Sequence, residues 1–159
     1  MALAEKIVGR HFRYPDHYRV EREKVREYAG AVKNTDPACF SDEAAAELGY
    51  AGVVAPLTFI SVFGYCAQTA FFADAGIGLT DKQIVQVDQA LRFLKPVTAG
   101  DTLYCDVYGH EVRQAHGTDI IVTKNIITNQ NGEVVQENYT TLAGRSEEDG
   151  ESGFNDGTA

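Results

Sequence analysis

The chain is poor in basic residues and cysteine, and it has no tryptophan. Its 159 residues carry 14 Lys and Arg against 23 Asp and Glu, which gives a formal net charge of −9. Because nucleic-acid binding depends on Lys and Arg at the phosphates, this deficit argues against a nucleic-acid partner. Cys39, Cys66 and Cys105 show no C-x-x-C spacing and no adjacent histidine, so no metal site is expected. We predict three buried, reduced thiols and no cofactor.

The N-terminal residues do not resemble a signal peptide, since the first ten hold Glu5, Lys6 and Arg10 without a long apolar stretch. We therefore predict a cytoplasmic protein. An uncharged run over residues 48–73 is long enough to cross a bilayer. However, it contains Pro56 and several polar residues, and acidic residues flank it, unlike the cationic flanks of membrane spans. We predict an enclosed core helix here and no membrane partner.

The length fits a single domain, which we place at residues 1–145. Residues 147–159 contain five acidic residues and no basic ones, and Phe154 is their only sizeable apolar group. Such a segment buries too little apolar surface to offset the entropy lost on ordering. We therefore predict an acidic, disordered tail over residues 146–159.

Helical periodicity predicts helices over residues 20–32, 42–48 and about 58–73. Ser41 is the expected N-cap of the second helix and Gly49 its end, and Thr58 or a neighbour is the expected cap of the third. After Gly78 the pattern alternates, which predicts five strands, at about 84–93, 102–108, 111–115, 119–128 and 134–143. Short turns between them indicate antiparallel neighbours in a meander. The sequence thus predicts an α+β fold in which a curved sheet wraps the long helix and its open faces pair with a second subunit.

Four segments carry a resemblance to a known family. They are Gly52–Phe59 before the long helix, Phe93–Leu103 after the first long strand, Arg13–Asp16 and Ile84–Gln89. Over about residues 5–145, the chain resembles the MaoC-type hot-dog (R)-hydratase/dehydratase family. Within that family it is most similar to the HadA-like subunits of the mycobacterial (3R)-hydroxyacyl-acyl-carrier-protein dehydratase. The resemblance implies a single hot-dog domain and a role in type II fatty-acid, or mycolic-acid, elongation.

Catalytic members of this family carry the motif Asp-x-Asn-Pro-x-His. With the motif proline on Pro37, Asn34 stands at the aspartate position and Cys39 at the histidine position. Dehydration of a 3-hydroxyacyl thioester needs a base for the α-proton and an acid for the departing hydroxyl. An amide does not titrate, and a thiol without a basic neighbour stays protonated, so the pair is degenerate. Asp36 is the remaining acid, but we favour a turn role before Pro37 for it, because no histidine lies near it in the sequence.

The resemblance implies a role in holding the acyl substrate. The substrate-binding residues that we predict are Pro56, Thr58, Ser61, Tyr65, Gln86 and Asn125. Apolar side chains of the long helix and of strand 84–93 are expected to supply an acyl tunnel, with Gln86, Asn125 and Ser61 near it. The alternative for Gln86 and Asn125 is simple solvent-facing alternation along a strand.

The leading hypothesis is a non-catalytic, substrate-binding subunit of a heterodimeric dehydratase, in which a homologous partner carries the Asp/His pair. Acyl carrier proteins are acidic, as is this chain, so the docking surface is expected mainly on the partner. On this chain, the alternative docking surface for the carrier protein is the basic cluster formed by Arg19, Arg22, Lys24 and Arg26. Two alternatives stay open: a self-sufficient hydratase or acyl thioesterase that uses Asp36, and a non-enzymatic acyl-binding module.

Overall fold

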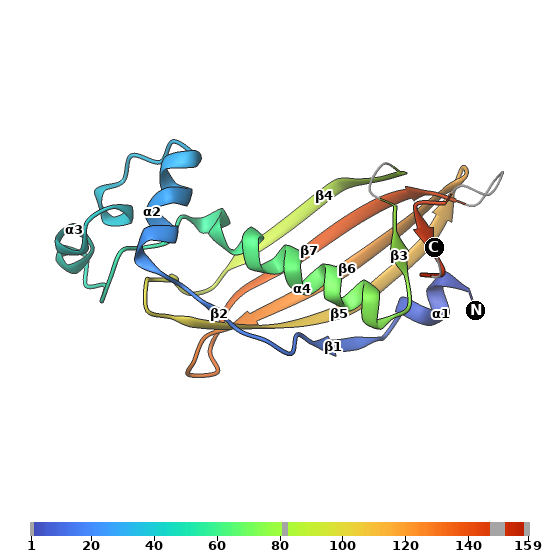
Figure 1. Cartoon of the computed structure of the whole chain (residues 1–159), viewed down its shortest axis with the longest axis horizontal. Helices are drawn as coiled ribbons and strands as arrows, with labels where there is room; N and C mark the ends of the chain where they lie inside the picture. Colours follow the sequence, from blue (N-terminus) through green and yellow to red (C-terminus); the bar gives the residue numbers. More distant parts are fainter. Residues whose placement is uncertain (1, 81–82, 147–151, 158–159) are drawn as a thin grey trace.

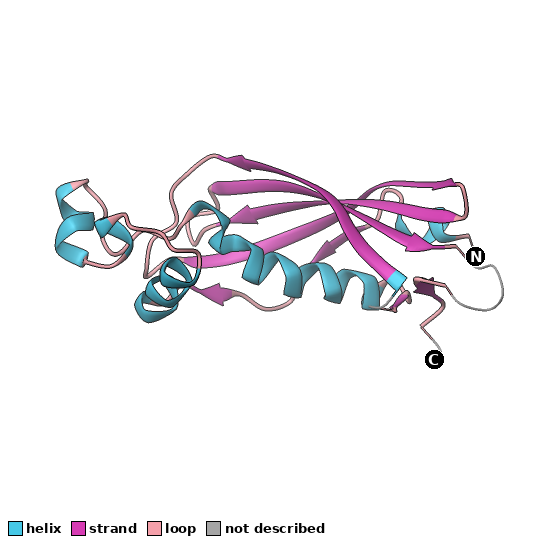
Figure 2. Cartoon of the chain, turned by 90° about the horizontal axis from the view of Figure 1, so that it is seen from above, coloured by secondary structure: helices cyan, strands magenta, loops and turns pink. Residues whose placement is uncertain are grey.

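A curved antiparallel sheet forms the body of the molecule, which the computed structural model describes over residues 2–80, 83–146 and 152–157. The strand order is β1 (His11–Arg13), β5 (Thr102–Ala115), β6 (Thr118–Thr128), β7 (Val134–Arg145) and β4 (Ile84–Phe93), and β2 (Tyr18–Arg19) also pairs with β5. One long helix, α4 (Ser61–Asp74), lies along one face of this sheet (Figures 1 and 2). The predicted α+β class is confirmed.

Two details of the predicted sheet are wrong. The strands expected at 102–108 and 111–115 are one strand, β5, with a register shift between Gly109 and Glu111. In addition, β4 pairs with β7 and not with the next strand along the chain, β5. The eight-residue connection 94–101 explains this pairing, because an extended segment of that length spans roughly 26 Å and can cross two strands spaced about 4.8 Å apart.

The side of α4 that faces the sheet is a row of aromatic residues. Phe63, Phe71 and Phe72 are buried there, together with Phe59 from the preceding 3-10 turn η2 (Leu57–Ile60). The opposite side is open, and Tyr65 is 68% exposed, so the prediction of a fully enclosed helix is wrong for this chain by itself. In the part of the chain that the structure describes, no helix is long and apolar enough to cross a membrane.

Two smaller predictions also fail along α4. Thr58 does not cap the helix, because η2 intervenes and the Thr58 hydroxyl instead accepts a hydrogen bond from the Tyr28 hydroxyl at 2.9 Å. The expectation of three buried thiols holds for Cys39 and Cys105 but not for Cys66, which lies on the exposed side of α4.

A small helical extension projects from one end of the sheet (Figure 1). It contains α2 (Arg22–Ala31), the 3-10 turn η1 (Pro37–Cys39) and α3 (Asp42–Glu47). The predicted cap of α3 is confirmed, since the Ser41 hydroxyl accepts a hydrogen bond from the Ala44 amide at 3.3 Å. At the opposite end of the molecule, α1 (Leu3–Ile7) packs against β5.

Residues 152–157, which we call the C-terminal strap, are ordered against the far end of α4. There β8 (Phe154–Asn155) pairs with β3 (Gly78–Leu79), and Phe154 is only 7% exposed. The Phe154 ring stacks on Phe72 with 6.1 Å between ring centroids and occupies space left open by Gly144. The prediction of a disordered tail is therefore wrong for the strap, because the Phe154 ring anchors it. The rest of the predicted tail after Ser146, residues 147–151 and 158–159, lies outside the described part of the chain.

Candidate functional site

The degenerate motif folds into a local hydrogen-bonded turn within the helical extension. The side-chain nitrogen of Asn34 lies 3.6 Å from the Cys39 sulfur. The side-chain oxygen of Asn34 accepts a hydrogen bond from the backbone amide of Asp36 at 2.8 Å. Asp36 in turn accepts from the Ala38 amide at 3.0 Å and caps η1. Burial, with the nearby Asp36 charge, raises the pKa of the Cys39 thiol, so it stays protonated near neutral pH. The turn contains no acid–base couple.

The histidines lie elsewhere. Three of them contact aromatic rings of the sheet, in the pairs His11–Tyr108, His17–Tyr104 and His110–Tyr139. The fourth, His116, occupies the turn between β5 and β6 with a positive φ of 50°. Among the described residues, no group of three His, Cys, Asp or Glu side chains is placed to hold a metal ion.

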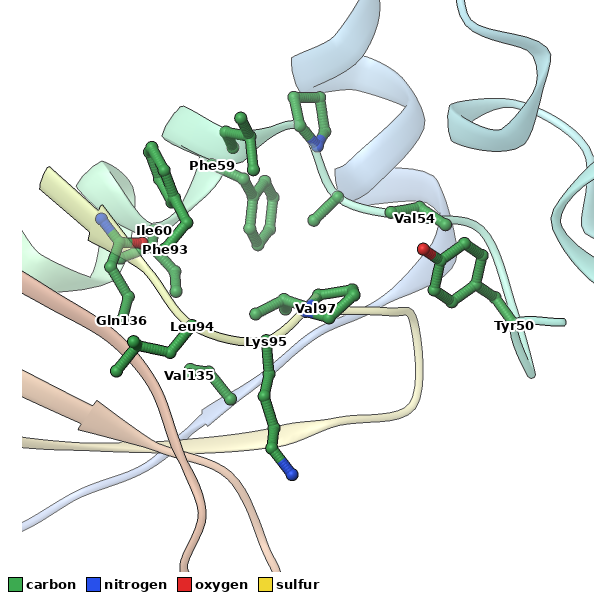
Figure 3. A pocket seen from close by; sticks show the side chains of 14 residues that line it. Tyr50, Val54, Phe59, Ile60, Phe93, Leu94, Lys95, Val97, Val135 and Gln136 are labelled. Carbon is green, nitrogen blue, oxygen red and sulfur yellow. The ribbon is translucent and has the colours of Figure 1, made fainter. Parts of the chain in front are cut away.

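An apolar cavity of about 300 Å³ lies at the start of α4, between the loop that precedes η2 and the connection that follows β4 (Figure 3). Phe59 and Ile60 line it from the helix side, and Phe93, Val97 and Val135 from the sheet side. Pro56 of the predicted site also lines this cavity.

A second, polar hollow of about 220 Å³ lies farther along α4, toward β4. Its lining residues are Ser61, Gly64, Tyr65, Gln68, Gln86, Gln89, Asn125, Asn138 and Thr140. Asn125 and Asn138 are only 2% and 3% exposed, and the side-chain oxygens of both lack a hydrogen-bond partner. A buried polar group without a partner costs about 1–3 kcal/mol. Both oxygens are fully buried in the chain by itself, so a hydrogen-bond donor in the polar hollow reaches them only when the side-chain amides turn toward it.

A third space, the apolar groove of about 200 Å³, continues toward the far end of α4. Phe72, Leu79, Ile84 and Leu142 supply its apolar wall. It shares Tyr65, Gln68 and Gln86 with the polar hollow. The two spaces therefore adjoin, with a polar compartment followed by an apolar one along the same helix.

Of the six predicted binding residues, Ser61, Tyr65, Gln86 and Asn125 line the polar hollow together. Thr58 lines none of the three spaces, and its hydroxyl accepts a hydrogen bond from Tyr28 instead. Sequence reasoning missed Gln68, Gln89, Asn138 and Thr140. A signal for the last two exists in β7, where Gln136, Asn138 and Thr140 alternate on one side and are all buried.

Comparisons with known proteins agree with this architecture. Residues 6–138 match the FAS1-like dehydratase domain region. A UPF0336 protein of Mycobacterium tuberculosis (strain H37Rv) is 67% identical over the full length of both chains. A subunit in the crystal structure of the C-terminally truncated HadBC (3R-hydroxyacyl-ACP dehydratase) complex of M. tuberculosis superimposes with a TM-score of 0.78 at 50% identity, over 87% of this chain and 97% of that one.

A longer solved chain, a MaoC-like dehydratase, superimposes with a TM-score of 0.81 at 37% identity. The match covers 91% of the present chain but 44% of the longer one. The protein therefore belongs to the FAS1-like dehydratase domain family and has the MaoC-like hot-dog fold.

Proposed function

We propose that this chain is the substrate-binding, non-catalytic subunit of a heterodimeric (3R)-hydroxyacyl-ACP dehydratase, which works in the cytoplasm in type II fatty-acid (mycolic-acid) elongation. A homologous subunit supplies the catalytic aspartate and histidine. The observation that carries the proposal is the turn in which Asn34 and Cys39 bond each other at the two catalytic positions.

The chemistry of dehydration requires acid–base groups that this chain lacks, so the catalytic residues are expected on the other subunit. Removing the α-proton and protonating the departing hydroxyl need groups that titrate near neutral pH. Asn34 cannot titrate, and burial keeps the Cys39 thiol protonated. Asp36 is already committed to the Ala38 amide in the turn. What this chain retains is space for the substrate beside a long helix.

The surface beside that space supports a partner subunit. β4 is an edge strand, and Val85 and Val87 on it are 61% and 56% exposed, close to the open side of α4 where Tyr65 projects. Exposed apolar residues on an edge strand favour association with another chain. The HadBC relative is itself a complex, which agrees with a heterodimer.

The two adjoining spaces suit an acyl thioester. The substrate has a polar head, with a hydroxyl donor near the thioester, and an apolar tail. The unpaired oxygens of Asn125 and Asn138 can accept from a hydroxyl or amide group, while the apolar groove takes the first part of the tail. Each methylene that leaves water for such a groove contributes about 0.8 kcal/mol.

Hydration of crotonyl thioester by the purified chain, with and without the subunit that co-purifies from the native source, tests the proposal. We expect slight turnover by the chain alone and full turnover by the pair. Rapid hydration by the chain alone, lost in Asp36→Asn, would instead establish the self-sufficient hydratase, and release of free thiol from the thioester would establish the thioesterase. Acyl binding without turnover in any native complex would establish a non-enzymatic module.

Gly64→Ala separates stability from binding. An added Cβ at this position would meet the amide nitrogens of Asn125 and Asn138 at 3.5 and 3.7 Å, which are ordinary contacts. Since alanine favours a helix over glycine by about 1 kcal/mol, we expect the melting temperature to rise by about 2–4 °C. The same methyl group narrows the polar hollow, so KM of the reconstituted pair should rise. Thermal unfolding and steady-state kinetics measure the two effects, and an unchanged KM would contradict our placement of the substrate head.

The basic cluster around the start of α2, which includes Arg19 of β2, is not expected to dock the carrier protein. Each of its four cations has a carboxylate within 4 Å, in the pairs Arg19–Glu21, Arg22–Asp42, Lys24–Glu27 and Arg26–Glu23. We expect Lys24→Ala combined with Arg26→Ala to change kcat/KM for a carrier-bound substrate by less than about twofold, because exposed ion pairs contribute little. A larger loss that is specific to the carrier-bound substrate, and absent with a coenzyme A thioester, would place docking on this chain.

A further inference from the structure

We infer that the C-terminal strap, residues 152–157, closes the far end of the apolar groove and that Phe154 limits the length of acyl chain that the groove accepts. This inference rests on the proposed function, because it assigns the apolar groove to the acyl tail. It concerns a segment that takes no part in the degenerate turn at Asn34 and Cys39 or in the polar hollow.

The apolar groove is the compartment into which a tail can extend. The polar hollow shares Tyr65, Gln68 and Gln86 with the groove, whereas its lining shares no residue with that of the apolar cavity at the start of α4. A thioester head in the polar hollow therefore has its direct apolar continuation in the groove. The walls at the far end of this groove are Phe72, Leu79 and Ile84.

The strap contacts all three of these walls from behind. Phe154 stacks on the Phe72 ring, and its backbone pairs with Leu79 in the β3–β8 ladder. At Gly153 the backbone runs so close to the sheet that an added Cβ would lie 3.0 Å from the Ile84 side chain. One short segment thus supports the whole end of the groove.

The strap is also fixed in place by its backbone. The Gly153 amide donates to the Arg145 carbonyl at 2.9 Å, and the Gly153 carbonyl accepts from the Thr80 amide at 2.9 Å. The Asn155 side chain donates to the Thr80 hydroxyl at 3.1 Å. These bonds hold the Phe154 ring over Gly144, where a side chain on the strand would collide with it. The end wall is therefore a built feature of the fold, and Phe154 is the side chain that fills it.

Removing the ring is expected to lengthen the groove. In Phe154→Ala, Phe72 and Leu79 no longer pack against the ring. The space that the ring occupied is then expected to become continuous with the apolar groove. Each additional methylene that then enters the groove should raise kcat/KM by about fourfold, the factor that corresponds to burial of one CH₂. Leu79→Trp, which fills the groove from its wall, should act in the opposite direction.

The test compares the reconstituted pair carrying wild-type chain, Phe154→Ala, Leu79→Trp or Phe12→Ala on 3-hydroxyacyl thioesters of increasing length. Phe12→Ala is the matched control, since it removes an aromatic ring that packs edge-on against Phe71 but lines none of the three spaces. We expect the ratio of long-chain to short-chain kcat/KM to rise in Phe154→Ala, fall in Leu79→Trp and stay unchanged in Phe12→Ala. Displacement of a fluorescent fatty acid by saturated fatty acids of the same lengths gives a second profile that does not need turnover.

The outcomes separate the two proposals. A pair that binds acyl chains with the predicted length shifts but does not turn over would support the strap and contradict the dehydratase. A pair that turns over short substrates with the same length profile in wild type, Phe154→Ala and Leu79→Trp would overturn the strap inference alone. If Phe154→Ala does not fold, Phe154→Leu, which keeps an apolar side chain but shortens it, takes its place with the same expected direction.

Discussion

Asn34→Ala and Cys39→Ala, introduced together into the reconstituted pair, are expected to leave kcat within about twofold of wild type. Replacing the histidine that aligns with Cys39 in the partner should instead lower kcat by about 10²–10⁴-fold, the usual contribution of a general acid–base group. The reason for the asymmetry lies in the turn itself. The Asn34 side chain donates a hydrogen bond to the Cys39 sulfur, and neither residue changes protonation state near neutral pH.

Single-turnover kinetics on crotonyl thioester measure both effects free of product release, and circular dichroism confirms that each variant is folded. Asp36→Asn serves as the control on this chain. An asparagine oxygen still accepts from the Ala38 amide, so the turn is kept while the last acid of the motif is removed. If the variants of this chain, and not those of its partner, abolished turnover, the assignment of roles would be reversed.

Much of the fold follows from sequence periodicity, because burial of an apolar face imposes it. In β6, for example, Ile121 and Ile127 point inward on the same side as Thr123 and Asn125. The pairing of β4 with β7 could not be obtained in this way, since periodicity fixes faces but not neighbours. The short strands β1, β2, β3 and β8 were missed for a related reason: two or three residues are too few for an alternation to show.

The candidate site shows the same limit. The degenerate pair at Asn34 and Cys39 was predicted from the motif alone, and the structure shows that the two residues meet. The polar hollow draws on α4, β4, β6 and β7, so only the tertiary fold could show that Asn138 and Thr140 share it with Asn125. Phe154 was noted as the only sizeable apolar group of the tail, but its anchoring role was missed. Its acidic, glycine-rich surroundings are typical of a disordered tail, and its partner, Phe72, lies far away in the sequence.

Asn125→Leu combined with Asn138→Leu should make the chain more stable and the reconstituted pair less active. Both amides are buried, and the oxygen of each lacks a partner, so a leucine of similar shape removes an uncompensated polar group. Relief of that cost should raise the free energy of unfolding by about 1–3 kcal/mol for each oxygen, less about 1 kcal/mol for the hydrogen bond that the Asn125 side chain donates to the Gly64 carbonyl. Urea unfolding of the isolated chain measures this change.

The same substitutions remove two hydrogen-bond acceptors from the substrate head. Since one such bond contributes about 0.5–1.5 kcal/mol, loss of two should lower kcat/KM of the pair by roughly 5- to 150-fold. Gln136→Leu is the matched control, because it replaces another buried amide of β7 that lies outside the polar hollow. Core asparagines with a purely structural role would give the opposite pattern, namely loss of stability with unchanged kcat/KM. We propose that the substrate head binds these two amides, and the opposite signs of the two measurements would support that assignment.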